Sequence, residues 1–511
     1  MAVKLGNGNW AVKEDKLLAY NDNSGLFFNK EFDFSRGTSA TYVAKDGLIK
    51  TAGIQPNIVT NGDFATDSDW TVTQSGSDTI TIENGYALFN CPNNSNIFIS
   101  QGGLLTVGKT YKASVDLLSI DSGSLQFAQG GGATISGSPS INTVGTHTFT
   151  FVAATATFAV KRKLGAPNLL NAKIDNVSVQ EIQTDTPRID FTNDTKGHLL
   201  LEPSRTNLFQ YSEDFSTWNN NNNAVVTDNF TTSPDGSQTA SKFTFDGTTN
   251  GNVQKPSTVT DSTQYTFSIW LKNDNLADPT QVWLAFRTSS KGQYITVTNE
   301  WQRFTITQNA SGTTEYPRVQ TSEVGSIFAW GAQFEEGSYA TSYIPTTGVA
   351  STRNADVCNN SGSAQDFNSE EGVLYAEIAA LTDEDDYNRY ISISDGTVSN
   401  SIMITYRLNG NLNLYNNGTG SSETIYGDAG YDLTDNLKIA VKYGASKSDY
   451  RVYINGVQKT VRTGFTATSI SGLNTLRFEQ GGGSNNFYGK VRNVQVFTEA
   501  LTDEQLQKLT S

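Results

Sequence analysis

The chain has 511 residues, too many for one hydrophobic core, and this length predicts about three or four domains. Its formal net charge is -15 and it has no basic run, which excludes the counterion release that drives nucleic-acid binding and disfavours anionic membrane surfaces. With 11% aromatic and only 17% charged residues, the composition also excludes a disordered, self-repelling chain. A neutral polysaccharide or another protein is the kind of partner that remains.

The N-terminal region shows no targeting signal. The first residues, MAVKLGNGNW, lack the apolar stretch of a signal peptide, and no apolar run approaches the roughly 20 residues that a membrane span needs. We therefore expect synthesis in a cytoplasm without ordinary export. Residues 1–30 predict a short arm, with apolar side chains such as Trp10 and Phe27. Such an arm either attaches a fibre to a particle or docks back on its own domain, and the sequence leaves both open.

Alternation of apolar and polar residues predicts β-strands along most of the chain. Residues 111–117, 265–271 and 450–454 are examples, because every second side chain in them falls on one face. Helical periodicity is confined to residues 502–510, where Thr502 caps the start and Gln505 completes a capping box. The pattern therefore predicts an all-β fold of tandem β-sandwiches.

Two of the predicted sandwiches open in the same way. One opens with the sequence NIVTNGDF at 57–64 and the other with NLFQYSEDF at 207–215, and each has a tryptophan a few residues later, Trp70 or Trp218. The period of roughly 150 residues matches a whole domain. We expect both tryptophans to pack in a core.

The first sandwich, residues 57–183, resembles the jelly-roll carbohydrate-binding modules. The resemblance rests on the sequence NGDF at 61–64 and on IDNV at 174–177. It implies two jelly-roll domains in tandem and a structural calcium ion held by Asp63 and Asp175, since carboxylate oxygens suit a hard cation. The alternative is that both carboxylates only accept hydrogen bonds from turn backbone.

Three further segments are FSRGTSATYVAKDGLI at 34–49, the stretch 186–207 with GHLLLEPSRTN, and the stretch 337–356 with GSYATSYIPT. All three are similar to segments common in phage structural proteins. In those proteins the first two segments are usually close in sequence, whereas here the first sandwich separates them. The resemblance therefore implies that 57–183 is inserted into a middle jelly-roll domain made of residues 31–56 and 184–356.

The last sandwich, residues 368–511, resembles the laminin G, or concanavalin A-like, fold. The matching pieces include GVLYAE at 372–377, YRVYING at 450–456 and GKVRNVQVF at 489–497. Asn455 and Gly456 predict a type I′ hairpin turn, which needs positive φ at both central residues.

Catalytic groups are scarce. A hydrolase needs paired acids on facing strands, or a nucleophile beside a base. The two histidines, His147 and His198, fall in an exposed strand and a turn, where a structural role is expected. The acidic residues 383–386 are contiguous, so strand neighbours would point to opposite faces; a solvated loop is expected, with a calcium site as the alternative. We expect that the protein is not an enzyme.

A lectin site needs aromatic side chains for the C–H faces of sugars and amides for their hydroxyl groups. In the last sandwich several such residues fall in or near predicted loops, and the alternative for each is core packing or surface decoration. The candidates are Tyr387, Arg389, Tyr415, Asn416, Asn417, Asn485, Asn486 and Phe487.

Together these features predict a bacteriophage virion protein, a fibre or receptor-binding protein that holds host-surface glycans. A head fibre or capsid decoration protein, with mainly structural contacts to other virion proteins, is the first alternative. A secreted glycoside hydrolase is the weaker one. The resemblance to fibres also implies a homo-oligomer, such as a trimer.

Overall fold

The computed structural model describes residues 9–13, 16–20, 32–165, 169–247, 250–274, 281–286, 292–382, 387–408, 410–418 and 421–511. The described residues form antiparallel sheets and very little helix, which confirms the predicted all-β fold of tandem sandwiches. The chain divides into two compact units, Gly53–Gln183 and the remainder, Met1–Ala52 with Thr184–Ser511. No helix in the described part is long and apolar enough to cross a membrane.

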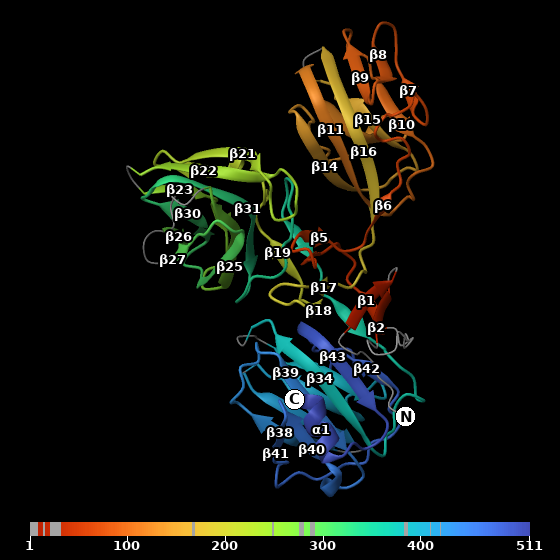
Figure 1. The fold of residues 1–511 in the computed structure, drawn as a ribbon, viewed down its shortest axis with the longest axis vertical. Helices are drawn as coiled ribbons and strands as arrows, with labels where there is room; N and C mark the ends of the chain where they lie inside the picture. Colours follow the sequence, from red (N-terminus) through yellow and green to blue (C-terminus); the bar gives the residue numbers. More distant parts are fainter. Residues whose placement is uncertain are drawn as a thin grey trace. The chain divides into compact units, whose positions relative to one another are not determined.

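The unit Gly53–Gln183 is a sandwich of two sheets, drawn in orange and yellow in Figure 1. The first sheet contains, in spatial order, β13 (Ala133–Thr134), β12 (Leu125–Gln129), β15 (Phe158–Arg162), β10 (Phe98–Gln101) and β7 (Thr71–Thr73). The second sheet contains β14 (Gly145–Val152), β11 (Thr110–Ser122), β16 (Leu170–Ile182), β9 (Tyr86–Cys91) and β8 (Thr79–Glu83), and β6 (Ile54–Asn57) pairs with β16.

Period-two alternation builds the core of this sandwich. In β11 the side chains of Tyr111, Ala113, Val115 and Leu117 are buried, whereas the residues between them face outward. Each fully buried aliphatic side chain of this kind contributes about 1.5–3 kcal/mol.

The middle sandwich also has two sheets. One contains β20 (Asn219–Asn221), β23 (Gly251–Gln254), β30 (Arg318–Thr321), β26 (Gln281–Ala285) and β27 (Gly292–Thr296). The other contains β21 (Val225–Thr231), β22 (Ala240–Asp246), β31 (Val324–Glu336), β25 (Gln264–Asn273) and β28 (Gln302–Asn309). The 3-10 helix η1 (Phe215–Thr217) and the short pair β24 (Ser257–Thr258) and β29 (Thr314–Glu315) complete it.

These two sandwiches have the same topology. Taken in chain order, β10, β12 and β15 hold the places in their sheet that β23, β26 and β30 hold in theirs, and the second sheets correspond in the same way. The repeat predicted from the two openings is therefore structural. Trp218 is buried against Phe209 and Phe215, and Trp70 packs on the core of the first sandwich, as expected.

The C-terminal sandwich closes the chain. Its larger sheet contains β17 (Ile189–Asp190), β18 (His198–Leu201), β43 (Gly489–Phe497), β34 (Gly372–Ala380), β39 (Leu437–Tyr443), β40 (Arg451–Ile454) and β41 (Val457–Lys459). Its smaller sheet contains β38 (Ser421–Asp428), β37 (Leu412–Gly418), β36 (Ser401–Tyr406), β35 (Arg389–Ser394) and β42 (Thr475–Arg477). The 3-10 helix η2 (Lys447–Asp449) and helix α1 (Asp503–Thr510) belong to the same sandwich.

Two local predictions are confirmed in this sandwich. Helix α1 starts at Thr502, whose hydroxyl accepts from the Gln505 backbone in a capping box. Asn455 and Gly456 have φ of 48° and 77°, as a type I′ turn between β40 and β41 requires.

Short ladders form in the segments that precede and connect the middle and C-terminal sandwiches. They are β1 (Asn9–Lys13) with β2 (Lys16–Tyr20), β3 (Asp33–Ser35) with β33 (Val357–Asn359), β4 (Thr41–Val43) with β5 (Ile49–Thr51), and β19 (Arg205–Asn207) with β32 (Ser351–Arg353). The other residues of the arm 1–30 lie outside the described part. The range 184–356 was predicted as middle domain, but its hairpin β17–β18 lies in the larger C-terminal sheet, because Leu199 and Leu201 bury in that core.

A buried cluster of charges joins three of these connecting segments. Arg188 donates to Glu202 (2.8 Å) and to Asp356, and Asp356 also accepts from Arg36 (3.0 Å). Arg353 lies 3.3 Å from Glu202. All five side chains are at most 3% exposed, so each carboxylate depends on the guanidinium groups around it.

We expect Asp356→Asn to destabilise the larger unit strongly. The change leaves three buried guanidinium groups with one carboxylate. Removing one partner of a buried ion pair lowers the free energy of unfolding by about 3–5 kcal/mol. Urea unfolding measures the loss. Lys50→Gln is the control, because the Lys50–Asp46 pair is about half exposed, and its unfolding midpoint should not move. Equal midpoints for Asp356→Asn and the wild type would contradict a stabilising role of the cluster.

The same cluster predicts a pH dependence. Burial by itself would raise the pKa of Glu202, but the charges of Arg353 and Arg188 and hydrogen bonds from Ser342 outweigh it and lower the pKa to about 2. The unfolded chain has the ordinary value of 4.5, so this stabilisation is complete above pH 4.5 and is lost as the pH falls toward about 2. When the pH is lowered across this range, the thermal unfolding midpoint should fall less in Glu202→Gln than in Glu300→Gln. Glu300 is the control because it is exposed.

Candidate functional site

The outer face of the five-stranded sheet in the middle sandwich carries a pair of aromatic rings. In β26, Val282 and Leu284 are fully buried in the core, so Trp283 between them points to the outer face. Tyr294 on β27 lies directly opposite Trp283, with 4.7 Å between the ring centroids and 63° between the ring planes. Tyr294 is 71% exposed. The pair offers solvent an aromatic surface on a paired, rigid ladder.

Gly292 makes room for the tryptophan ring. A Cβ atom at Gly292 would lie 2.5 Å from Cε2 of Trp283, which no real side chain tolerates. The indole therefore lies against the backbone of β27, and only glycine at this position permits that placement.

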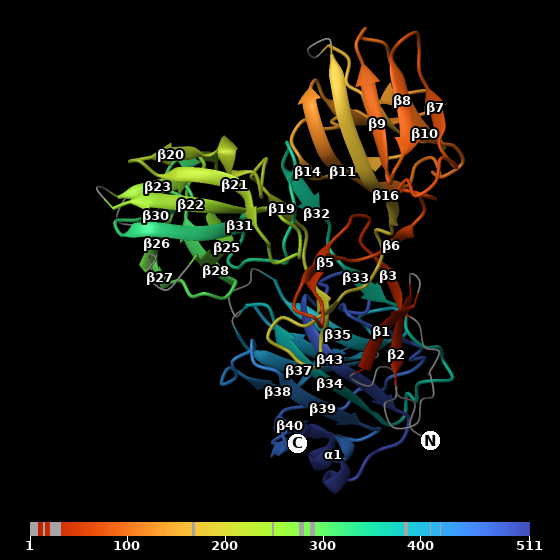
Figure 2. The ribbon, with the colours of Figure 1, turned by 45° about the horizontal axis from the view of Figure 1, so that its top comes forward.

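Amide side chains continue the row of the two aromatic residues. Gln320 on β30 lies opposite Trp283, and Asn252 on β23 lies opposite Gln320. The row ends at Asn221 on β20, whose Nδ2 donates to Oδ1 of Asn252 (3.0 Å). Figure 2 shows the five strands labelled from β20 to β27 down this sheet. Rings at one end and amides at the other match the two kinds of group on a sugar, C–H faces and hydroxyls.

The equivalent face of the inserted sandwich is covered by its own loop. Phe98 on β10 points outward there, but a Cβ atom at Gly132 would lie 2.8 Å from its ring. Nζ of Lys161 donates to the Gly132 carbonyl (2.8 Å) and holds the loop down. The exposed fraction of Phe98 is only 8%. The two sandwiches thus share a topology and differ in whether this face is open.

Trp283 and Tyr294 were not among the residues predicted to contact a glycan. A signal was present, because both aromatics fall out of phase with the apolar core residues of their strands, in QVWLA at 281–285 and in GQYIT at 292–296. The two rings meet only because of the register between β26 and β27, which the sequence pattern does not specify.

Three of the predicted glycan contacts lie together in the C-terminal sandwich. The ring of Tyr387 meets that of Tyr488 edge to face, with centroids 5.7 Å apart. Nδ2 of Asn486 donates to the Tyr488 hydroxyl (3.1 Å), and the exposed Asn485 donates to Gln480 (2.7 Å). Tyr488 was not among the predicted residues.

Four other predicted contacts are buried, so they are not exposed to a glycan as predicted. Asn416 and Asn417 lie in β37; Asn416 accepts from Thr468, and Asn417 donates to the Val398 carbonyl. The ring of Phe487 packs in the core against Phe478 and Tyr406, and Arg389 donates to the Thr382 carbonyl. These four side chains complete the interior: Arg389, Asn416, Asn417 and Phe487.

Tyr415 has an intermediate position. It is half-buried in β37, and its hydroxyl accepts from Asn413 (2.8 Å) and Arg407 (3.2 Å). It therefore belongs to the outer face of the smaller C-terminal sheet.

The two predicted calcium ligands both accept hydrogen bonds from backbone N–H groups, Asp63 in a turn and Asp175 within β16. Oδ1 of Asp63 accepts from the Ala65 N–H (3.4 Å), and Oδ1 of Asp175 accepts from the Asn176 N–H (2.6 Å). Among the described residues, no group of three or more His, Cys, Asp or Glu side chains is arranged to hold a metal ion. The acidic residues 383–386 lie outside the described part.

Both histidines occupy structural positions. His147 is a half-buried residue of β14, with Nε2 2.7 Å from the Thr143 carbonyl. His198 is 2% exposed at the start of β18, between Asp190 and Asp194. Burial lowers the pKa of His198, although Asp190 and Asp194 act to raise it.

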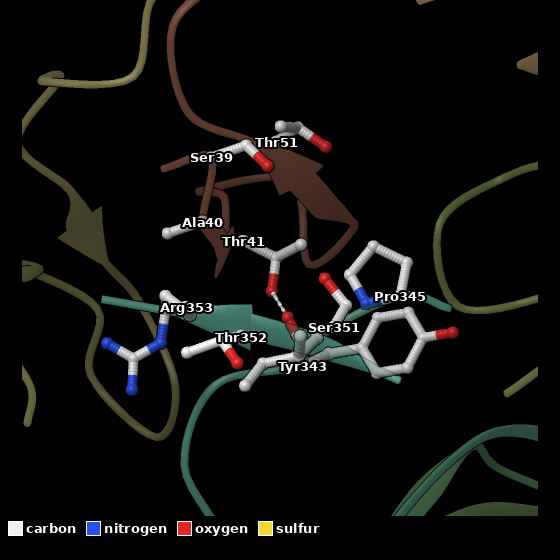
Figure 3. A pocket seen from close by; sticks show the side chains of 10 residues that line it. Ser39, Ala40, Thr41, Thr51, Tyr343, Pro345, Ser351, Thr352 and Arg353 are labelled. Carbon is white, nitrogen blue, oxygen red and sulfur yellow. Dashed lines mark hydrogen bonds between the residues drawn. The ribbon is translucent and has the colours of Figure 1, made fainter. Parts of the chain in front are cut away.

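A small pocket lies between the β4–β5 hairpin and the segment that contains Tyr343 and Arg353 (Figure 3). The Thr41 hydroxyl closes one side by donating to the Tyr343 carbonyl (2.5 Å). Its volume of about 40 Å³ admits water, whereas sites for small-molecule ligands have about 300–1,000 Å³. The sheet faces are therefore the larger candidate surfaces.

Residues 375–507 match the family model described as the concanavalin A-like lectin/glucanases superfamily, of laminin G type. The C-terminal sandwich is concanavalin A-like. The model covers about a quarter of the chain and leaves the other two sandwiches unassigned. Among curated proteins, none matches the sequence.

Several solved structures are similar to parts of this chain at low identity. A carbohydrate-binding module of family 40 from the Ruminococcus gnavus IT-sialidase is 17% identical, with TM-score 0.24, and covers 30% of this chain and 94% of its own. Domain 4 of the arabinanase AbnA from Geobacillus stearothermophilus is 13% identical, with TM-score 0.25. The match covers 34% of this chain and 84% of that domain's chain. The tandem family 22 carbohydrate-binding modules of Paenibacillus barcinonensis Xyn10C are 9% identical, with TM-score 0.21. The match covers 59% of this chain and 100% of theirs. Likeness at this level carries no information about ligand or activity.

We expect Gly292→Val to displace the indole of Trp283, because the new side chain occupies the volume of the ring. The indole N–H resonance of Trp283 should shift in an NMR spectrum, whereas the resonances of buried tryptophans such as Trp218 should not. Gly464→Val is the control, since no atom lies within 4 Å of its added Cβ. An unmoved Trp283 resonance would contradict the described packing.

Proposed function

We propose that this chain is a multidomain glycan-binding protein whose middle sandwich stacks sugar rings on Trp283 and Tyr294. The observation that carries the proposal is this pair, the exposed Tyr294 and the half-buried Trp283, in one row with Gln320 and Asn252. The match of residues 375–507 to a superfamily that includes lectins also supports a carbohydrate ligand.

We propose further that the ligand is held and not cleaved. The hydrolase alternative needs two carboxyl groups facing each other across a bound glycosidic bond. Prolonged incubation with a bound oligosaccharide, followed by an assay for reducing ends, separates the two. Release of new reducing ends at a catalytic rate would overturn the binding proposal in favour of the hydrolase.

As the setting we propose a bacteriophage particle, assembled in the host cytoplasm. The support is the similarity of the segments at 34–49, 186–207 and 337–356 to phage structural proteins. Many copies on one particle, such as trimeric fibres, would turn weak contacts with host-surface glycans into firm attachment. Binding to host cells that soluble saccharide blocks supports this adhesin; binding only to purified capsids supports a head fibre or decoration protein instead.

We also propose that Asp63 and Asp175 hold a structural calcium ion. If the ion is bound, a chelator lowers the thermal unfolding midpoint of the inserted sandwich, and the double variant Asp63→Asn with Asp175→Asn removes that effect. A midpoint that the chelator leaves unchanged in the wild type contradicts the proposal and favours the backbone hydrogen bonds alone.

Replacing Trp283 or Tyr294 by alanine should weaken glycan binding by about tenfold, since an aromatic contact contributes about 0.5–1.5 kcal/mol beyond its buried area. The probe is a glycan array, followed by titration calorimetry with the saccharide that binds best. Phe230→Ala is the matched control, because Phe230 is 46% exposed on the opposite sheet of the same sandwich. Equal losses in all three variants would show that the outer face has no special role.

A further inference from the structure

A second row of residues crosses the same outer face next to the aromatic row. Ala285 on β26 lies opposite Gly292 on one side and opposite Arg318 of β30 on the other. The Trp283 indole lies against Gly292 on one side of Ala285, and Arg318 is the strand neighbour of Ala285 on the other side. Gln254 lies opposite Arg318 on β23 and extends the row with an amide.

Arg318 has no acidic partner, unlike the arginines of the buried charge cluster. It is only 9% exposed, its Nε has no hydrogen-bond partner, and it forms no ion pair within the described part of the chain. Burial lowers the pKa of Arg318, and no carboxylate acts to raise it. Arg36 and Arg188, by contrast, both pair with Asp356.

An unpaired buried charge is costly, and it is surprising in a chain whose acidic residues outnumber its basic ones by 51 to 36. Packing alone does not account for it, since an uncharged side chain of similar length fills the same space at lower cost. A guanidinium that keeps its donors free is suited to an acidic group, because its fork binds carboxylate or sulfate oxygens with two parallel hydrogen bonds.

We infer that Arg318 binds the acidic group of the ligand, so that the outer face selects glycans bearing a carboxylate or sulfate beside the ring that stacks on Trp283. The inference rests on the proposed function and specifies its substrate class. The negative net charge of the chain repels such glycans at long range, so the preference arises from the local contact with Arg318.

Matched pairs of saccharides test the inference. The pairs are oligogalacturonate with its methyl ester, sialyllactose with lactose, and a sulfated oligosaccharide with its unsulfated form. The wild type should bind at least one acidic member about ten to a hundred times more tightly than its neutral partner, as charged hydrogen bonds of about 1.5–3 kcal/mol imply. The first two pairs report on carboxylate and the third on sulfate.

Two variants separate the inference from the proposed function. Arg318→Gln should bring the affinity for the acidic member down to that for the neutral one and leave the neutral affinity unchanged. Trp283→Ala should weaken both. If neutral glycans bind through Trp283 and their acidic partners bind no more tightly, the inference is overturned and the proposed function stands. If no glycan binds, or Trp283→Ala changes nothing, the proposed function itself fails.

Thermal unfolding distinguishes a binding role of Arg318 from a structural one. Removal of an unpaired buried charge should leave the midpoint of Arg318→Gln unchanged or raise it. Arg188→Gln, which breaks the buried cluster, should lower the midpoint clearly. A fall in Arg318→Gln as large as in Arg188→Gln means that the side chain supports the fold, and it overturns the inference.

Discussion

The larger unit depends on a cluster of charges that is buried where its segments meet. Arg36, Arg188, Glu202, Arg353 and Asp356 come from segments more than 300 residues apart at the extremes, and each is almost fully removed from water. Charges of this kind are tolerated only with complementary partners at close range. The cluster therefore ties together the distant segments that carry its members.

This constraint leaves the sandwiches free to diverge. Two of them share a strand order, yet the outer face of one is closed by the Gly132 loop and the same face of the other displays Trp283 and Tyr294. The cores need only alternating apolar residues on the inner face. The outer residues carry no such requirement, and they are where duplicated domains acquire different ligands.

For the proposed function, a sheet face suits recognition of a sugar better than the loops in which the sequence predicted glycan contacts. Trp283 and Tyr294 are held by paired backbone and by the contact with Gly292, so little side-chain entropy is lost when a ring stacks on them. In the C-terminal sandwich, by contrast, Asn416 and Phe487 are used to complete the interior, and their polar or aromatic character serves packing.

The sequence by itself determined the all-β class, the repeat of the first two sandwiches, the concanavalin A-like C-terminal region and the caps and turns at Thr502 and Asn455. The all-β class, the caps and the turns depend on periodicity or on local backbone chemistry, which neighbouring residues express directly. The repeat and the concanavalin A-like region were inferred from similar sequence segments. Only the tertiary structure decided that β17 and β18 pair with β43, that Arg389 is buried, and that Trp283, Tyr294 and Arg318 share one face. Those outcomes depend on register and on pairing between distant strands. Alternation indicates which residues of one strand share a face, but it does not indicate which other strand pairs with that strand.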